Sequence, residues 1–205
     1  MHYELLFSFV LATAALAISP GPDNIYVLIQ SITNGKKYGL ATVAGLISGC
    51  IIHTTFLAFG VSAVIKENDT LFFYIKLFGA FYLLYLAYKV FRGDSRILLS
   101  NENVHKKSLS QLFKQGFIMN VLNPKVSIFF LAFFPGFLFS DSLSAVFQFY
   151  VLGFIFMFVS LILFSSIAIL AGSISDYIKK NKNLGVVLKW LQIIVFIGIA
   201  ILILL

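Results

Sequence analysis

Two charged side chains lie within apolar stretches of the sequence, and each stands next to a proline. Asp23 belongs to the segment Ser19-Pro20-Gly21-Pro22-Asp23-Asn24, and Lys125 to the segment Asn120-Val121-Leu122-Asn123-Pro124-Lys125. A carboxylate can take up a proton or bind an ammonium group, and a lysine ammonium can bind a carboxylate. The two residues therefore predict a site for a proton or for a small zwitterion.

Uncharged polar residues near these charges extend the candidate site. Asn24 directly follows Asp23, and Asn123 lies two residues before Lys125. Asn120 lies three residues before Asn123. His53 falls in the middle of another apolar stretch, and an imidazole can relay protons near neutral pH. We expect substrate binding or proton coupling at Asp23, Asn24, Lys125, Asn123, Asn120 and His53. A structural Asp23–Lys125 ion pair and a structural, hydrogen-bonded His53 are the alternatives.

Both segments predict an interrupted helix. A proline inside a helix removes an amide donor and clashes with the preceding turn. Asparagine is a good N-cap and proline a good first residue, so a half-helix is expected to begin at Pro124. Backbone that is not helical is tolerated at membrane depth only inside protein or beside a watery cavity. The breaks are expected at Ser19, Pro20, Gly21, Pro22 and Pro124; a pair of simple proline kinks is the alternative.

The composition indicates which elements must hold these residues. The chain has 205 residues, of which 60% are hydrophobic and 11% charged, whereas soluble domains carry about 45–50% apolar and roughly 25% charged residues. A spanning helix needs about 20 apolar residues. We therefore predict an all-α, polytopic membrane protein with six transmembrane helices, at about 5–32, 40–65, 71–91, 116–139, 143–172 and 184–205.

Interruptions in the first and fourth of six spans predict two related halves. Three spans in each half give the halves opposite orientations in the membrane. We expect one transporter domain over 1–205, with inverted three-helix repeats at about 1–92 and 116–205 and a cytoplasmic loop at about 93–115. Broken helices at matching positions of such repeats point to a transporter binding site. Spans one and four are thus expected to be discontinuous and to meet.

The charges outside the spans predict the orientation. The first, third and fifth connections hold 12 of the 15 Lys and Arg residues, against three acidic residues. Cytoplasmic loops carry the excess of Lys and Arg. The basic loops are therefore predicted to be cytoplasmic and both termini outside. Orientation and contact with anionic lipid explain the net charge of +7, so nucleic acid is not expected as a partner.

Other classes of function find less support in the residues. A single cysteine, Cys50, excludes a disulfide framework and a dithiol relay within the chain. No serine–histidine–acid or metal-ligand motif points to an enzyme, and a transition-metal site would need clustered His, Cys and carboxylate ligands. We expect no enzymatic activity, no bound metal and no cofactor besides protons as the coupling ion. A transporter of a metal cation or another small metabolite is the alternative.

Four further patterns predict local structure. Gly45 and Gly49 form a small-residue face that ends near His53 and would let a neighbouring helix approach closely. Ser108-x-x-Gln111 has capping-box spacing and predicts a short interfacial helix before the fourth span. The Phe-rich stretch 129–139 is expected to be lipid-facing and packing surface. Three serines of the fifth span either line a polar path or bond between helices: Ser160, Ser165 and Ser166.

Together these motifs resemble the lysine-exporter/RhtB (LysE/RhtB) family of bacterial amino-acid exporters over essentially the whole chain. The resemblance rests on the segments 19–24 and 116–125, the glycine face before His53, and the segment 76–89. Ala87 stands where many relatives carry glycine, and Gly136 where many carry glutamine. Neither departure touches the central segments.

The resemblance implies a secondary exporter of amino acids in the bacterial cytoplasmic (inner) membrane, driven by proton antiport with alternating access. It points to the residues of both breaks: Pro20, Gly21, Pro22, Asp23, Asn24, Asn123, Pro124 and Lys125. Because Asp23 is the only acidic residue deep in any span, we expect neutral amino acids or their derivatives as substrates. Membrane lipid is the expected surrounding, and a homo-oligomer is compatible with so small a domain.

Overall fold

The computed structural model describes residues 2–63, 68–94, 107–180 and 184–204. Every regular element in these ranges is a helix, and no strand occurs among them. Four helices are long and apolar enough to cross a membrane, and two bent helix pairs bring the number of candidate spans to as many as six. The prediction of an all-α, polytopic membrane protein is confirmed.

The first span is interrupted where its prolines predict. Helix α1 (Tyr3–Ile18) and helix α2 (Pro22–Asn34) are bent by 58° across residues 19–21. Pro22 is the first residue of α2, a position at which its missing amide donor is no loss. Gly21 precedes it in an extended conformation, with φ at −163°. The chain therefore leaves one helix, runs extended for a few residues and begins another.

The fourth span is interrupted in the same way. Helix α6 (Leu109–Val121) and helix α7 (Pro124–Ile128) are bent by 48° at their junction. The chain continues through a π-helical turn, η2 (Phe129–Phe133), and a 3-10 turn, η3 (Phe134–Phe137). Asn123 caps α7, since its Oδ1 accepts a hydrogen bond from the Lys125 amide at 3.0 Å. The predicted discontinuity of spans one and four is confirmed.

The start of the fourth span differs from the prediction. The capping box is present, with both reciprocal hydrogen bonds between Ser108 and Gln111. The helix that it begins is α6 itself, which runs unbroken to Val121. A separate interfacial helix and a span beginning at 116 are therefore wrong, and residues 109–115 of the expected connection belong to α6. The end of a span tolerates a cation such as the exposed Lys114, because a lysine stem can carry its charge to the interface.

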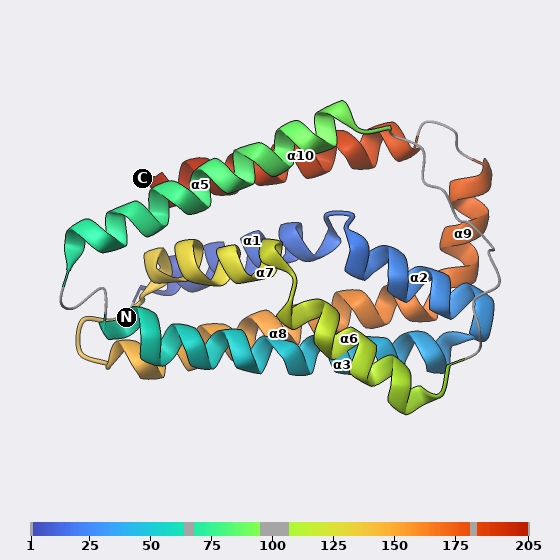
Figure 1. Cartoon of the computed structure of the whole chain (residues 1–205), viewed down its shortest axis with the longest axis horizontal. Coiled ribbons are helices and arrows are strands. Elements are labelled where there is room, and N and C mark those ends of the chain that lie inside the picture. Colours follow the sequence, from blue (N-terminus) through green and yellow to red (C-terminus); the bar gives the residue numbers. More distant parts are fainter. Residues whose placement is uncertain (1, 64–67, 95–106, 181–183, 205) are drawn as a thin grey trace.

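The other spans are continuous helices. They are α3 (Lys36–Phe56) with the π-helical turn η1 (Leu57–Val61), α5 (Asp69–Arg92), α8 (Ala145–Ile169) and α10 (Leu184–Leu204). The short helix α9 (Ala171–Lys180) lies across one end of the bundle (Figure 1). The fifth span therefore ends at Ile169 rather than at 172. Both termini lie at the opposite end (Figure 1), as an even number of spans requires.

Helices α3 and α6 pack at close range through glycines. A Cβ at Gly45 would collide with the carbonyl of Phe113, and a Cβ at Gly116 would collide with the carbonyl of Thr42. A Cβ at Gly49 would stand 2.6 Å from Oδ1 of Asn120. The predicted small-residue face is confirmed, and its partner is the first half of the broken fourth span.

The Phe-rich stretch is part of the core. Phe129, Phe130, Phe133 and Phe134 are at most 2% exposed. The ring of Phe9 in α1 stands edge-on to Phe134, with 4.9 Å between ring centres. The expected lipid-facing position of this stretch is wrong for these side chains, because α1 and α8 enclose them. Its expected role in packing is confirmed.

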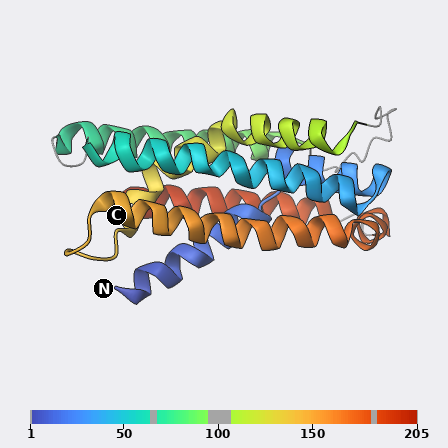
Figure 2. The same ribbon diagram turned by 90° about the horizontal axis from the view of Figure 1, so that it is seen from below.

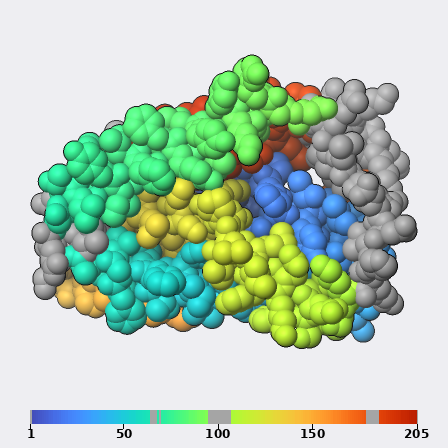
Figure 3. All heavy atoms as spheres, viewed as in Figure 1, coloured from blue at the N-terminus to red at the C-terminus, as the bar shows by residue number. Residues whose placement is uncertain are grey.

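Helices α5 and α10 form a pair along one side of the bundle (Figure 1). The main contacts of this pair with the rest of the molecule are made with α1, α7 and η2. On the other side α3 and α8 run lengthwise together, whereas α1 crosses obliquely (Figure 2). The space-filling view shows a hollow between the α5–α10 pair and α2 (Figure 3). The pair thus covers the bundle incompletely.

Candidate functional site

A hydrogen bond joins the two helix breaks. Nδ2 of Asn123 donates to Oδ2 of Asp23 at 2.9 Å, although the two residues lie 100 positions apart. Asp23 stands in the first turn of α2 and is 7% exposed, and Asn123 is the N-cap of α7. Two half-helices therefore begin beside one carboxylate. Their N-terminal ends carry partial positive charge and stabilise a negative group there.

Lys125 reaches from α7 to the end of α1. Its Nζ lies 3.3 Å from the carbonyl oxygen of Leu16, 3.5 Å from that of Ser19 and 5.3 Å from the centre of the Phe196 ring. The C-terminal end of a helix carries partial negative charge and favours a cation. Among the described residues, Lys125 makes no direct ion pair with Asp23, and Asn123 bridges them by bonding to the carboxylate and to the Lys125 amide.

The last four carbonyls of α1 all have donors, as a helix end inside a membrane requires. The Ser19 amide serves the first of them and Lys125 the second. Nδ2 of Asn24 serves the other two, since it lies 2.8 Å from the oxygen of Ala17 and 3.4 Å from that of Ile18. Asn24, predicted as a substrate ligand, is thus occupied as a cap of α1 at the edge of the site.

Other polar groups at the breaks have no hydrogen-bond partner among the described residues. No described residue donates to Oδ1 of Asp23, and none accepts from the backbone amides of Asp23 and Asn24. At α7, by contrast, Asn123 already accepts from the amides of Lys125 and Val126. A carboxylate group would therefore find free amides at the start of α2 and not at α7.

These groups border a cavity of about 30 Å³. This volume holds about two water molecules and is too small for an amino acid. The residues that line it from the breaks include Gly21, Asp23, Asn24, Asn123 and Lys125; Cys50, Asn120, Phe156, Ser160 and Phe164 line it from α3, α6 and α8. The site must therefore widen before a larger molecule can enter.

Comparison with known proteins identifies the family. The family model for the LysE type translocator matches residues 14–205. The chain belongs to the LysE type translocator family. Two curated relatives are each named homoserine/homoserine lactone efflux protein, one from Salmonella typhimurium at 29% identity and one from Salmonella typhi at 30%. Each alignment spans 184 residues, 90% of this chain and 88% of the relative. No solved structure matches this chain.

The family resemblance inferred from the motifs is thereby confirmed, and the protein is a multi-pass membrane translocator. In the described ranges, no three His, Cys, Asp or Glu side chains come together as metal ligands. The metal-cation alternative gains no support from this part of the translocator. The charged residues of the central cavity are those of the two breaks, Asp23 and Lys125.

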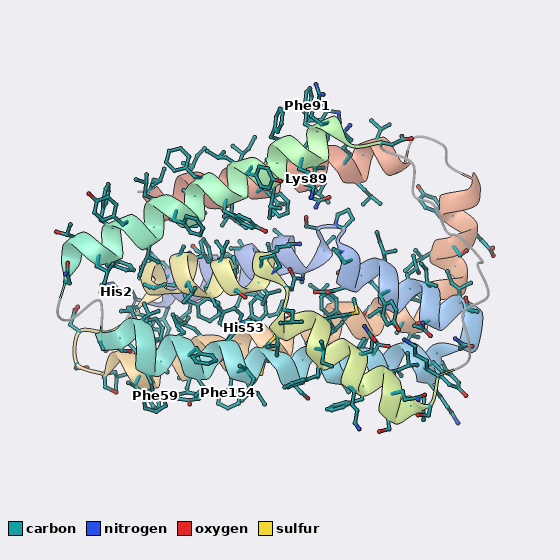
Figure 4. The ribbon with its side chains drawn as sticks, in the orientation of Figure 1. His2, His53, Phe59, Lys89, Phe91 and Phe154 are labelled. Carbon is teal, nitrogen blue, oxygen red and sulfur yellow. The ribbon has the colours of Figure 1, made fainter. Side chains whose placement is uncertain are left out.

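His53 of this translocator lies beside the central cavity and not on it. Its Nε2 is 3.1 Å from the carbonyl oxygen of Asn120, so Nε2 carries a proton and donates. His53 borders a different, mostly apolar groove of about 440 Å³ together with Ser127 and Phe130. Figure 4 shows it between α3 and the α6–α7 junction. Asn120 separates the two spaces, since its side chain lines the central cavity while its carbonyl binds His53.

One wall of the cavity was only partly foreseen. Of the three serines considered for a polar path, Ser160 lines the cavity and Ser165 and Ser166 do not. Phe156 and Phe164, which flank Ser160 in the wall, were missed. Their four-residue spacing places all three side chains on one face of α8. No break or charge marks this triplet within α8, so the sequence offers little to single it out.

Proposed function

We propose that this translocator exports a neutral amino acid or amino-acid derivative from the cytoplasm in exchange for protons. One observation carries the proposal: Asp23 and Lys125 line the same cavity at two helix breaks without pairing directly with each other. Charges in the membrane interior are costly and mark transport pathways. The names of the relatives support a substrate derived from an amino acid.

The unoccupied groups suit the two charges of a zwitterion. The ammonium group would bind Oδ1 of Asp23, which receives no hydrogen bond from any described residue. The carboxylate group would bind the free amides at the start of α2, with the Lys125 ammonium close by. A Cβ at Gly21, in the break just before α2, would lie 3.7 Å from Nζ of Lys125, so that charge stands next to the extended backbone.

Proton coupling follows from the shared use of one carboxylate. Asp23 can hold a proton or attract the substrate ammonium, but protonation removes the negative charge that attracts the ammonium. A proton entering from outside would thus release the substrate, and loss of that proton on the cytoplasmic side would restore binding. This competition couples the two movements without a second carboxylate in the cavity, if the protein changes sides only when a proton or the substrate ammonium neutralises Asp23.

Alternating access would come from movement of two inverted halves. The cavity has to widen to admit an amino acid, and the breaks give α1–α2 and α6–α7 places to bend. The hollow beside α2 lies toward the end of the bundle that carries α9, opposite the termini (Figures 1 and 3). The excess of basic residues in the loops supports a cytoplasmic position for that end, with both termini on the outer side of a bacterial inner membrane. The hollow would then be the entry for cytoplasmic substrate.

The test is transport by purified protein in vesicles with an imposed pH gradient. Wild-type protein is expected to move labelled L-homoserine against its gradient in exchange for protons. Asp23→Asn should abolish proton-driven movement, and Lys125→Met should weaken substrate binding about 10- to 100-fold, the range for hydrogen bonds to charged groups. Lys76→Met is the matched control, because Lys76 lies in α5 and does not line the cavity.

Folding has to be separated from function in these variants, because Lys125 also caps α1. Lys125→Arg keeps a cation at the same position, and size-exclusion chromatography in detergent checks that each variant is monodisperse. Full proton-driven transport by Asp23→Asn would refute the coupling role. Failure of folded wild-type protein to move any neutral amino acid would refute the proposed function.

A further inference from the structure

Ser160 of α8 has a buried hydroxyl group without a partner. The side chain is 1% exposed, and its Oγ makes no hydrogen bond in the described part of the chain. A serine inside a helix commonly donates to the carbonyl four residues earlier. Ser166 does so on the same helix, with 2.8 Å between its Oγ and the oxygen of Ile162. Ser160 does not, so its hydroxyl is left for something inside the cavity that it lines.

The neighbours of Ser160 make this wall otherwise apolar. Phe156 and Phe164 stand one helical turn on either side, and both line the cavity. They are 5% and 8% exposed, so they are fixed in the interior. One polar group between two aromatic rings is the arrangement by which pockets fix the orientation of a small ligand.

The opposite wall carries the charges. Of the described residues that line the cavity, only Asp23 and Lys125 are charged, and both belong to the helix breaks. A substrate whose ammonium and carboxylate groups bind there would direct its side chain toward α8. No charge on α8 is available to accompany a charged substrate side chain.

We propose that Ser160 binds the side chain of the substrate, and that its hydroxyl is the group by which the site distinguishes a side chain with an uncharged polar group from an aliphatic one. This inference rests on the proposed function, and it adds a specificity residue to it. Phe156 and Phe164 restrict the length and width of the side chain. A purely aliphatic side chain leaves the Ser160 hydroxyl unpaired, which disfavours that substrate.

The experiment compares two probes that differ only at the group in question. L-homoserine and L-norvaline have side chains of equal length, with a terminal hydroxyl in one and a methyl in the other. Full-length protein in vesicles is expected to prefer homoserine about tenfold in kcat/KM, roughly the value of one neutral hydrogen bond. Ser160→Ala should bring this ratio close to one by raising the KM for homoserine, while transport of norvaline stays unchanged.

Matched variants keep the result interpretable. Ser160→Thr retains a hydroxyl and should keep the preference. Ser166→Ala on the exposed side of α8 should behave as wild type. If Ser160→Ala transports neither probe, Ser160→Cys, which has similar volume and a weak donor, provides the second comparison and should show an intermediate ratio.

Two outcomes would overturn the inference. In a Ser160→Ala protein that still transports, an unchanged ratio at wild-type rates would mean that the hydroxyl binds only cavity water, and an unchanged ratio with an equal loss for both probes would mean that Ser160 is only structural. In either case wild-type transport of the probes would leave the proposed function standing. Absence of transport of both probes by the wild type would instead count against the proposed function itself.

Discussion

Replacing Asn24 by alanine separates a structural role from a substrate-binding role at the first helix break. The substitution removes Nδ2, which lies 2.8 Å from the oxygen of Ala17 and 3.4 Å from that of Ile18. Both carbonyls belong to the last turn of α1, and no other described donor bonds to them at that helix end. The substitution therefore leaves two carbonyls of this helix end without a partner from the described protein.

Nδ2 of Asn24 also lies 3.3 Å from the oxygen of Ser19, but an amide nitrogen has only two hydrogens to donate, so the expected loss of stability is set by two hydrogen bonds. Each net hydrogen bond contributes about 0.5–1.5 kcal/mol, so Asn24→Ala should lower the free energy of unfolding by about 1–3 kcal/mol. Asn24→Asp should lose at least as much, because a carboxylate cannot donate. It also adds a negative charge next to Asp23. Transport by the protein that remains folded should keep its KM, because Nδ2 of Asn24 is already engaged at the end of α1.

The assay is reversible unfolding in mixed micelles, with transport measured on the same preparations. Asn34→Ala is the control, because it is the same substitution on the same helix. Asn34 makes one hydrogen bond, to the Gln30 side chain at 3.0 Å. Asn34→Ala should therefore lower the free energy of unfolding by an amount at the lower end of the range expected for Asn24→Ala. Equal stability of the Asn24→Ala and Asn34→Ala proteins, together with a raised KM in the former, would refute the capping role.

Two further substitutions test packing and a buried polar network. Gly116→Ala should lower the free energy of unfolding by about 1–3 kcal/mol, because its Cβ would meet the backbone of Thr42. Gly198→Ala is the control: there is open space around Gly198, so the substitution should be neutral or slightly stabilising. Equal effects of the two substitutions in the same unfolding assay would contradict this. Gln148→Leu should lower the free energy of unfolding by about 2–4 kcal/mol, because Oε1 of Gln148 accepts hydrogen bonds from the amides of Phe139 and Ser140. A change below about 0.5 kcal/mol would show that water takes over these two hydrogen bonds.

The helix breaks could be predicted because their causes are local. Pro22 and Pro124 each open a new helix, and Asn123 caps the second one, as the types of these residues require. The face of Gly45 was also visible in the sequence. Its partner Gly116 was not, because the sequence does not show which two helices will pack together.

The roles of the polar residues around the breaks depended on geometry that no local pattern contains. Asn24 reaches back seven residues because α2 leaves α1 at an angle of 58°. Lys125 binds carbonyls of α1 more than 100 residues away rather than Asp23. His53 was placed correctly at the end of the face of Gly45, but only the structure separates its groove from the central cavity. The capping box predicted the start of α6, but the continuation of this helix into the fourth span was missed, because its polar first turns fall below the hydrophobicity expected of a span.

The donors at the end of α1 become available at different times during synthesis. Asn24 follows Ala17 by seven residues, whereas Lys125 follows Leu16 by 109. At about 5–20 residues per second, the ribosome adds Lys125 roughly 5–20 s after Leu16. During that interval the Leu16 carbonyl lacks the donor that it has in the finished protein. The first span therefore has to stay beside water or the insertion machinery. The two halves of the protein cannot mature one after the other, because the first is completed by an atom of the second.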